Sequence, residues 1–150
     1  MSSDCIIRRA TEADVEEVTD LFVSYLKFYR RGCEPSSAKN FISERLATGD
    51  SEIFLATISG RAVAFVQLYP TFSSLSLKRV WILNDMFVQP SARKQGVGGA
   101  LLARVKQFAV ETGAAYVTLE TADKNRAARQ LYEQNGYQQS REFLHYELPL

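Results

Sequence analysis

Three glycines lie close together in the segment VQPSARKQGVGGALLARVKQF, residues 88–108. Gly96, Gly98 and Gly99 let the backbone take positive φ angles and approach a ligand closely. The segment follows an expected strand and opens an expected helix, and the first backbone N–H groups of a helix favour an anion. Two basic residues just before the glycines add positive charge. The pattern therefore predicts a phosphate-binding loop.

Two well-known phosphate-binding motifs do not fit this loop. The dinucleotide fingerprint GxGxxG needs a small third residue, but Leu101 occupies that place after Gly96 and Gly98. A Walker loop needs Gly-Lys followed by Ser or Thr, and the sequence contains no such tripeptide. Dinucleotide binding and nucleoside triphosphate chemistry are therefore disfavoured.

The elements that must position this loop alternate along the chain. Apolar residues three and four apart predict helices, β-favouring runs predict strands, and Ser59-Gly60 predicts a tight hairpin turn. In order, we expect a strand 5–9, a helix 11–26 capped by Thr11, a shorter helix around 41–46, strands 52–58 and 61–69, a polar loop 71–78, a strand 79–88, the helix after the glycines, a strand 114–121, a helix around 128–132 and a closing strand 143–150. This order predicts an α/β domain with a mixed sheet, because a parallel strand pair needs a crossover helix.

Length and composition set the class of protein. At 150 residues we expect a single domain, 1–150, and 46% hydrophobic with 23% charged residues is typical of a globular chain. A net charge of +1 argues against a nucleic-acid partner. The apolar runs are too short to cross a membrane, and the N-terminus lacks a signal core. Cys5 and Cys33 lack CxxC spacing. We expect a cytoplasmic protein with reduced thiols and no metal.

Several motifs together resemble the GNAT superfamily of N-acetyltransferases. The pattern Arg93-x-x-Gly96-x-Gly98 opens a long amphipathic helix, and NRAARQLYEQNGY resembles the last helical motif of that family. LNDMFVQPSAR upstream and IIRRATEADVEEV near the N-terminus extend the resemblance over nearly the whole chain. The resemblance implies a GNAT-type fold: a mixed, mostly antiparallel twisted sheet with a splayed central pair of parallel strands, flanked by helices.

The resemblance also implies that acetyl-CoA is the co-substrate. Its pyrophosphate would lie on the N–H groups of the glycine loop, and its thioester in the gap between the strand that ends near Val88 and the strand 114–121. The residues then expected to contact the coenzyme are Phe87, Val88, Arg93, Lys94, Gln95, Gly96, Val97, Gly98, Gly99, Ala100, Asn125 and Tyr132.

Acetyl transfer to an amine needs a base, an oxyanion donor and an acid. The attacking amine must be neutral, although a lysine-like ammonium has a pKa of about 10.4, and Asp85 and Glu120 are the candidate bases. A backbone N–H near Phe87 or Val88 is the candidate donor to the developing oxyanion. The departing thiolate takes a proton, and the resemblance implies Tyr132 as that acid.

Each candidate also has a structural interpretation. Tyr132 is spaced like a core aromatic residue, and Asn125 is suited to cap the last helix. Glu120 ends a strand, where a solvated carboxylate is common. Asp85 either faces the acceptor or pairs with an arginine. His145 lies in an alternating terminal strand, so we expect a structural role for it.

We expect the acceptor to be the primary amine of a small molecule, such as an amino acid or a polyamine. The loop region looks most like the branch that holds the diamine acetyltransferases and the yeast histone and polyamine acetyltransferases. However, Asn84 replaces the glutamate of the diamine enzymes. Lys27, Arg30 and Arg31 favour an anionic amine over a polycation.

Other functions stay open on the sequence. They are a protein lysine or N-terminal acetyltransferase, a non-catalytic acyl-CoA sensor, and an interaction domain without coenzyme. The resemblance and the apolar alternation over 143–150 together predict a homodimer.

Overall fold

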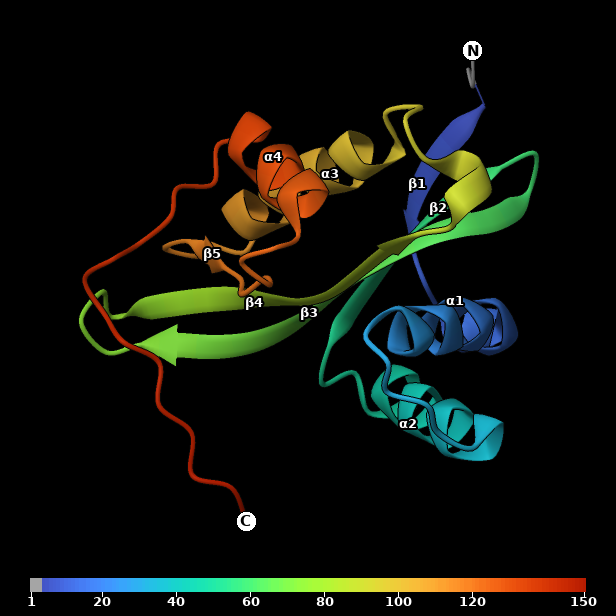
Figure 1. Ribbon diagram of the computed structural model, residues 1–150, viewed down its shortest axis with the longest axis horizontal. Coiled ribbons are helices and arrows are strands. Elements are labelled where there is room, and N and C mark those ends of the chain that lie inside the picture. The colour runs from blue at the N-terminus through green and yellow to red at the C-terminus, as the bar shows by residue number, and fades with distance from the viewer. Residues whose placement is uncertain (1–3) are drawn as a thin grey trace. The chain divides into compact units, whose positions relative to one another are not determined.

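A five-stranded sheet is the framework of the computed structural model, which describes residues 4–150 (Figure 1). The elements are β1 (Cys5–Arg9), the 3₁₀ turn η1 (Glu12–Asp14), α1 (Val15–Phe28), α2 (Pro35–Thr48), β2 (Glu52–Ile58), β3 (Arg61–Ser73), β4 (Lys78–Val88), the 3₁₀ turn η2 (Pro90–Ala92), α3 (Val97–Glu111), β5 (Val117–Thr118) and α4 (Arg126–Gln134). Two compact units divide after Glu120, and α4 belongs to the second. The single domain expected over 1–150 stays a prediction.

The sheet has the strand order β1-β2-β3-β4-β5, and its topology confirms the predicted α/β class. The first four strands run antiparallel, and β4 and β5 run parallel with α3 as their crossover helix. The parallel pairing is confined to Trp81 with Val117 and Ile82 with Thr118. Beyond Ile82, β4 therefore keeps β3 on one side and has no strand partner among the described residues on the other. This is the expected splayed pair.

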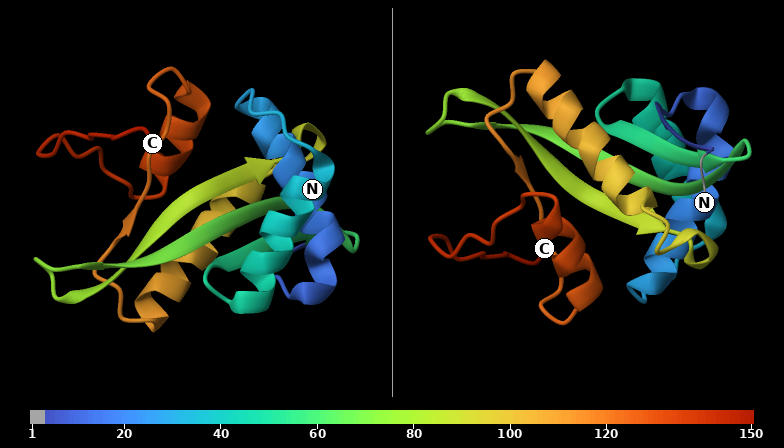
Figure 2. Two further views of the ribbon diagram at one scale, coloured as in Figure 1. Left: turned by 90° about the horizontal axis from the view of Figure 1, so that it is seen from below. Right: turned by 90° about the horizontal axis from the view of Figure 1, so that it is seen from above.

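Helices cover both faces of the sheet. Figure 1 shows α1 and α2 on one face and α3 on the other, and Figure 2 shows the same layers from below and above. Ile53 and Leu55 pack in the core beneath α1 and α2. Phe54, between them, meets Phe108 of α3 with ring centroids 5.4 Å apart. Successive strand residues point to opposite faces, so β2 is buried on both sides, as its continuous apolar run requires.

A β-bulge in β4 reverses the faces of that strand. Leu68 pairs with Leu83 and Gln67 with Asp85, so Asn84 is the extra residue. Trp81 lies on the α3 face, where its ring is 4.9 Å from that of Phe108. Phe87, six residues later, belongs to the core on the α1 and α2 face. A regular strand would place both on one face, so the bulge is what brings the residues after Asn84 to the α1 and α2 side.

Two features predicted from local signals, a hairpin turn and a helix start, are confirmed. Ser59 and Gly60 have φ angles of +52° and +76°, the two positive values of a two-residue type I′ hairpin. At the start of the first helical segment, the carboxylate of Asp14 accepts the backbone N–H of Thr11 at 2.8 Å. Arg8 donates two further hydrogen bonds to that carboxylate, at 2.9 and 2.8 Å.

Other element predictions need correction. The second helix is not short: it begins at Pro35, whose fixed φ and missing N–H suit the first turn. The predicted polar loop 71–78 is shorter in the structure, because β3 continues to Ser73 and β4 begins at Lys78, which leaves only residues 74–77 as the turn. The predicted strand 114–121 pairs over only two residues.

The predicted closing strand 143–150 is wrong. Residues 138–150 form neither helix nor strand, and the large apolar side chains among them are exposed. Alternation indicates which face of a strand would be buried, but it does not supply a neighbouring strand to pair with. Separately, no helix in the described part of the chain is long and apolar enough to span a bilayer.

Candidate functional site

The glycine loop leads into α3 with free N–H groups. Gly96 is the N-cap and has a φ of +81°, in the left-handed region that glycine adopts at little cost. The N–H of Ala100 bonds to the carbonyl of Gly96 at 3.0 Å and closes the first helical turn. The N–H groups of Val97, Gly98 and Gly99 precede that bond, so they have no acceptor within the helix. This geometry suits an anion at the helix start.

Side chains of the loop brace it against the end of β4. The Nε of Arg93 donates to the carbonyl of Val88 at 2.8 Å, and its guanidinium lies 5.5 Å from the ring centroid of Phe87. The Nε2 of Gln95 donates to the carbonyl of Ser91 at 3.0 Å. Lys94 has a φ of +61°, a strained value for a non-glycine residue and one often found at ligand-binding turns. Contacts of these side chains with phosphate stay a prediction.

The open edge of β4 leads directly to the loop. The N–H of Gln89 donates to the carbonyl of Val63, so it points toward β3. Successive N–H groups of an extended chain point in opposite directions, and the N–H of Val88 therefore points away from β3, toward the open edge. Of the two residues named as oxyanion donors, Val88 has the suitable direction and Phe87 does not.

A pocket of about 350 Å³ lies between α1, α2 and the β3–β4 pair. Its lining side chains are Phe22, Tyr25, Leu26, Tyr29, Arg31, Phe41, Tyr69, Asn84 and Asp85. Asp85 is only 4% exposed, and the bulge at Asn84 is what turns it to this face. The size and the aromatic lining are typical of a small-molecule site.

Hydrogen bonds hold Asp85 in a buried chain. Gln67, which is fully buried, donates from Nε2 to Oδ2 of Asp85 at 2.5 Å, and the hydroxyl of Ser51 donates to Oε1 of Gln67 at 2.8 Å. Asn84 donates from Nδ2 to Oδ1 of Asp85 at 3.0 Å. The hydroxyl of Tyr25 donates to the backbone carbonyl of Asn84 at 3.2 Å. The orientation of the carboxylate is therefore fixed.

Burial perturbs the titration of this pocket. It raises the pKa of Asp85 above the usual range of a carboxyl group, and the hydrogen bonds from Gln67, Asn84 and Tyr25 lower that pKa in part. Burial, with the nearby charge of Asp85, also raises the pKa of the Tyr69 hydroxyl to about 12. General bases are often carboxylates in a pocket whose pKa is raised.

Three other predicted site residues come from the part of the chain after β5. Glu120 is exposed, two residues after β5. Asn125 caps α4, its side chain accepting the N–H of Ala128 at 3.2 Å. Tyr132 is half-buried in α4, and its ring lies 5.7 Å from that of Tyr137. The cap agrees with the structural interpretation of Asn125, while the catalytic and coenzyme roles of these three predicted residues stay predictions.

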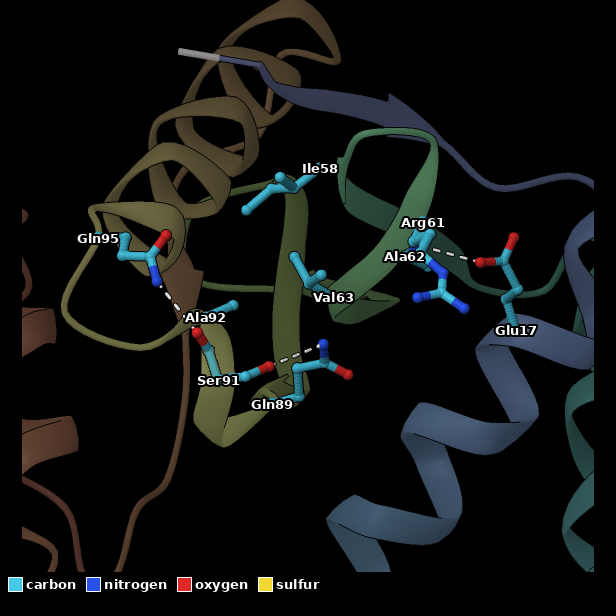
Figure 3. Close-up of a pocket in the computed structure, with 9 residues that line it drawn as sticks. All are labelled: Glu17, Ile58, Arg61, Ala62, Val63, Gln89, Ser91, Ala92 and Gln95. Carbon is cyan, nitrogen blue, oxygen red and sulfur yellow. Dashed lines mark hydrogen bonds between the residues drawn. The ribbon is translucent and has the colours of Figure 1, made fainter. Parts of the chain in front are cut away.

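A second cavity, of about 390 Å³, borders the loop (Figure 3). It contains Gln95 and one carboxylate, that of Glu17, which accepts the backbone N–H of Ala62 at 2.9 Å. Gln89 donates to the hydroxyl of Ser91 across its floor at 3.2 Å. Because its polar groups mostly bond to one another, this cavity offers less chemistry than the pocket at Asp85. Among residues 4–150, no group of three His, Cys, Asp or Glu is arranged to hold a metal ion.

Sequence reasoning missed the residues that surround Asp85. The sequence pattern places Gln67 in an apolar strand and Tyr25 on a helix face that packs in the core, and it assigns neither a role in the site. Each has a feature in the sequence that sets it apart. Gln67 is the one polar residue in the run AFVQLY, and Tyr25 is followed four residues later by Tyr29 at the end of the helix. A polar atom in a buried run needs a partner, which points to another polar residue on a neighbouring strand.

Comparison with known proteins gives one consistent family. The family model described as "Acetyltransferase (GNAT) family" matches residues 15–137. An uncharacterized N-acetyltransferase of Bacillus subtilis (strain 168), YhfO, is 46% identical over 140 residues, covering 93% of this chain and 94% of that protein. The aminoalkylphosphonate N-acetyltransferase of Salmonella typhimurium is 27% identical over 136 residues, covering 91% and 86%. The crystal structure of a probable acetyltransferase matches with a TM-score of 0.91 and 42% identity, covering 97% of both chains.

Proposed function

This chain belongs to the GNAT family of acetyltransferases, and we propose that it transfers the acetyl group of acetyl-CoA to the primary amine of a small molecule by direct attack in a ternary complex. An acyltransferase activity with acetyl-CoA as donor follows from the family. The proposal concerns the acceptor and the residues. The observation that carries it is the buried carboxylate of Asp85 at an aromatic pocket beside the open edge of β4.

Asp85 acts as the general base in this proposal. An amine reaches the pocket mostly as an ammonium, and it must lose a proton before it attacks the thioester carbonyl. The buried carboxylate accepts that proton, and its raised pKa brings its basicity closer to that of the amine. Glu120 is the weaker candidate because it is exposed and does not line the pocket.

Backbone N–H groups and one tyrosine supply the other functional groups in this proposal. The N–H groups of Val97, Gly98 and Gly99 hold the pyrophosphate of acetyl-CoA at the start of α3. The N–H of Val88 at the open edge donates to the carbonyl oxygen as negative charge develops there, which is worth about 2.7–4 kcal/mol for a preorganised donor. Tyr132 donates the proton that the departing thiolate needs.

A small acceptor is favoured by the shape of the pocket. About 350 Å³ bounded by rings accommodates a small amine. The relative from Salmonella typhimurium is named for aminoalkylphosphonates, which are small amines, and this supports the same class here. A protein lysine or N-terminus is the alternative acceptor that the test must exclude.

The test follows release of free coenzyme A thiol with acetyl-CoA and a panel of amines, amino acids, polyamines and lysine peptides. Tyr132→Phe is expected to lower kcat by about 10²-fold or more while leaving the acetyl-CoA KM nearly unchanged. Tyr137→Phe is the matched control, because it removes a hydroxyl from the neighbouring ring and keeps the rate.

Each other function predicts a different result in that test. A thermal shift with acetyl-CoA but no thiol release with any acceptor would favour a sensor. Neither shift nor release would favour a domain without coenzyme. Release with peptides alone would make the chain a protein acetyltransferase.

We also propose a homodimer in the cytoplasm. The exposed Phe143, Leu144, Tyr146, Leu148 and Leu150 offer apolar surface to a second copy. Light scattering tests the assembly, and a mass of one chain, 16.9 kDa, would contradict it.

A further inference from the structure

The pocket at Asp85 contains two charged side chains of opposite sign. Arg31 and Asp85 both line it, and its other lining residues are aromatic or uncharged. Asp85 is buried, whereas Arg31 is exposed and therefore lies toward solvent. The pocket thus offers a negative group inside and a positive group at its solvent-exposed side.

The backbone fixes Arg31 at the end of α1. The N–H of Arg31 donates to the carbonyl of Leu26 at 2.8 Å, and the N–H of Arg30 donates to that of Lys27 at 3.0 Å. These two bonds form a Schellman motif at the helix end, in which the C′ residue, the first residue beyond the C-cap, is usually glycine. Here that residue is Arg30, with a φ of +56°, a conformation that costs a side-chain-bearing residue energy. The chain therefore retains a strained turn that sets Arg31 beside the pocket.

Aromatic rings and a carboxylate surround the place for the amine. Tyr25 lies with its ring centroid 6.1 Å from that of Phe22 and 5.1 Å from that of Tyr29. Ring faces attract ammonium groups, and the ionised carboxylate of Asp85 attracts them as well. Arg31 would repel a second ammonium on the same molecule.

Within the described part of the chain, no carboxylate forms an ion pair with the basic residues on the positive side of the pocket. The ion pairs among residues 4–150 include none of Lys27, Arg30 and Arg31. On the basis of the proposed function, we infer that the acceptor is a small zwitterionic amine, whose anionic group binds Arg31 while its amine faces Asp85.

Three acceptors with the same amine and a similar chain length test this inference. They are 3-aminopropanoate, propylamine and 1,3-diaminopropane, which end in an anionic, a neutral and a cationic group. The longer pair 4-aminobutanoate and butylamine controls for reach. The anionic member of each pair is expected to have a kcat/KM at least about tenfold above the neutral one, with the diamine lowest. Calorimetric titration of the same amines into the protein saturated with coenzyme A measures binding without turnover.

Two variants separate Arg31 from general positive charge. Arg31→Gln is expected to bring the anionic and neutral acceptors within about threefold of each other. Arg30→Gly removes the same charge one residue away and relieves the positive φ, so it keeps the preference and the fold.

The two readouts distinguish failure of the inference from failure of the proposed function. Equal or weaker binding and turnover of the anionic amines would overturn the inference while acetyl transfer to amines still stands. An equal loss of preference in Arg31→Gln and Arg30→Gly would also overturn it, because no specific contact would then exist. If calorimetry shows the anionic preference but no acceptor releases thiol, the inference is supported and the proposed function fails.

Discussion

The hydrogen-bond chain behind Asp85 has a direction that a double substitution can reverse. The hydroxyl of Ser51 donates to Gln67, and the amide of Gln67 donates to Asp85 at 2.5 Å. A second donor, the amide of Asn84, bonds the other carboxylate oxygen at 3.0 Å. Asp85 thus accepts on both oxygens, and the side chain of Gln67 accepts from Ser51 and donates to Asp85.

Each single substitution damages this arrangement. In Asp85→Asn, an NH2 group replaces one carboxylate oxygen, so one of the two amide donors, Gln67 or Asn84, loses its acceptor in a buried place. That costs about 1–3 kcal/mol of unfolding free energy. In Gln67→Glu, two carboxylates share a short buried contact, and one of them must take up a proton. We expect Gln67→Glu to destabilise at least as much as Asp85→Asn.

The double variant Gln67→Glu with Asp85→Asn restores every hydrogen bond. The carboxylate introduced at position 67 accepts from Ser51 and from the amide introduced at position 85, whose oxygen still accepts from Asn84. Its unfolding free energy should fall within about 1 kcal/mol of the wild type, which requires a coupling energy of about 1–3 kcal/mol or more between the two sites. Activity should not return, because the carboxylate now lies one residue behind the pocket, and loss of a general base costs about 10²–10⁴ in rate.

Urea unfolding and thiol release on the four proteins decide the outcome. If the loss of unfolding free energy in the double variant equals the sum of the losses in the two single variants, the hydrogen bonds between positions 67 and 85 do not contribute to stability as described. Full activity in Asp85→Asn or in the double variant would show that the base lies elsewhere, and Glu120 would then be the next residue to replace.

Three further predictions concern the loop, the fold and the pH dependence. Gly96→Ala should lower the free energy of unfolding by about 1–2 kcal/mol because its φ is +81°, whereas Gly99→Ala, in ordinary helical conformation, should raise it by up to about 1 kcal/mol. An added Cβ would meet no atom within 4 Å at either position, so the difference comes from backbone conformation. Melting temperatures that change in the same direction in both variants would refute this reasoning. Asp14→Asn should cost about 1–2 kcal/mol at pH 7, since its hydrogen-bonded arginine lowers the pKa of Asp14 to about 2. This stability is fully present above the ordinary carboxyl pKa and is lost as pH falls through about 2, so the melting temperatures of variant and wild type should converge at the acid end of this range. For catalysis, kcat/KM should rise with pH through the raised pKa of Asp85. The hydrogen bond from Gln67 lowers that pKa, so Gln67→Leu should raise it and move the rise in kcat/KM to higher pH. A pH profile that does not move, or that moves to lower pH, would contradict the proposed base.

Features set by local rules could be predicted from the sequence. The turn at Ser59-Gly60 and the helix start after Thr11 depend on residues a few positions apart, and the structure has both. The glycine loop is likewise local, because a left-handed N-cap at Gly96 follows from the glycine itself. The loop in turn locates the N–H groups at the start of α3 that are proposed to bind phosphate.

Features set by pairing between strands could not be predicted in the same way. Residues 71–73 of the predicted polar loop belong to β3 because β4 continues alongside them, which composition does not reveal. The segment 143–150 has the composition of a strand but pairs with none in the described chain. Strand propensity depends on the neighbours that a segment finds, so the pattern alone over-predicted the strands 114–121 and 143–150 and predicted β3 too short.

The bulge at Asn84 is the pairing feature on which the site depends. Read as a regular strand, β4 would send Trp81 and Asp85 to the same face, and the acid would then meet α3. The extra residue lets Trp81 stay with Phe108 while Asp85 turns to Gln67 and Tyr25. The carbonyl of Asn84 accepts the Tyr25 hydroxyl, so the bulge also ties α1 to the strand. One irregularity therefore assembles the acid, its supporting amide and the aromatic wall, which is why Asp85 could be named from sequence but its surroundings could not.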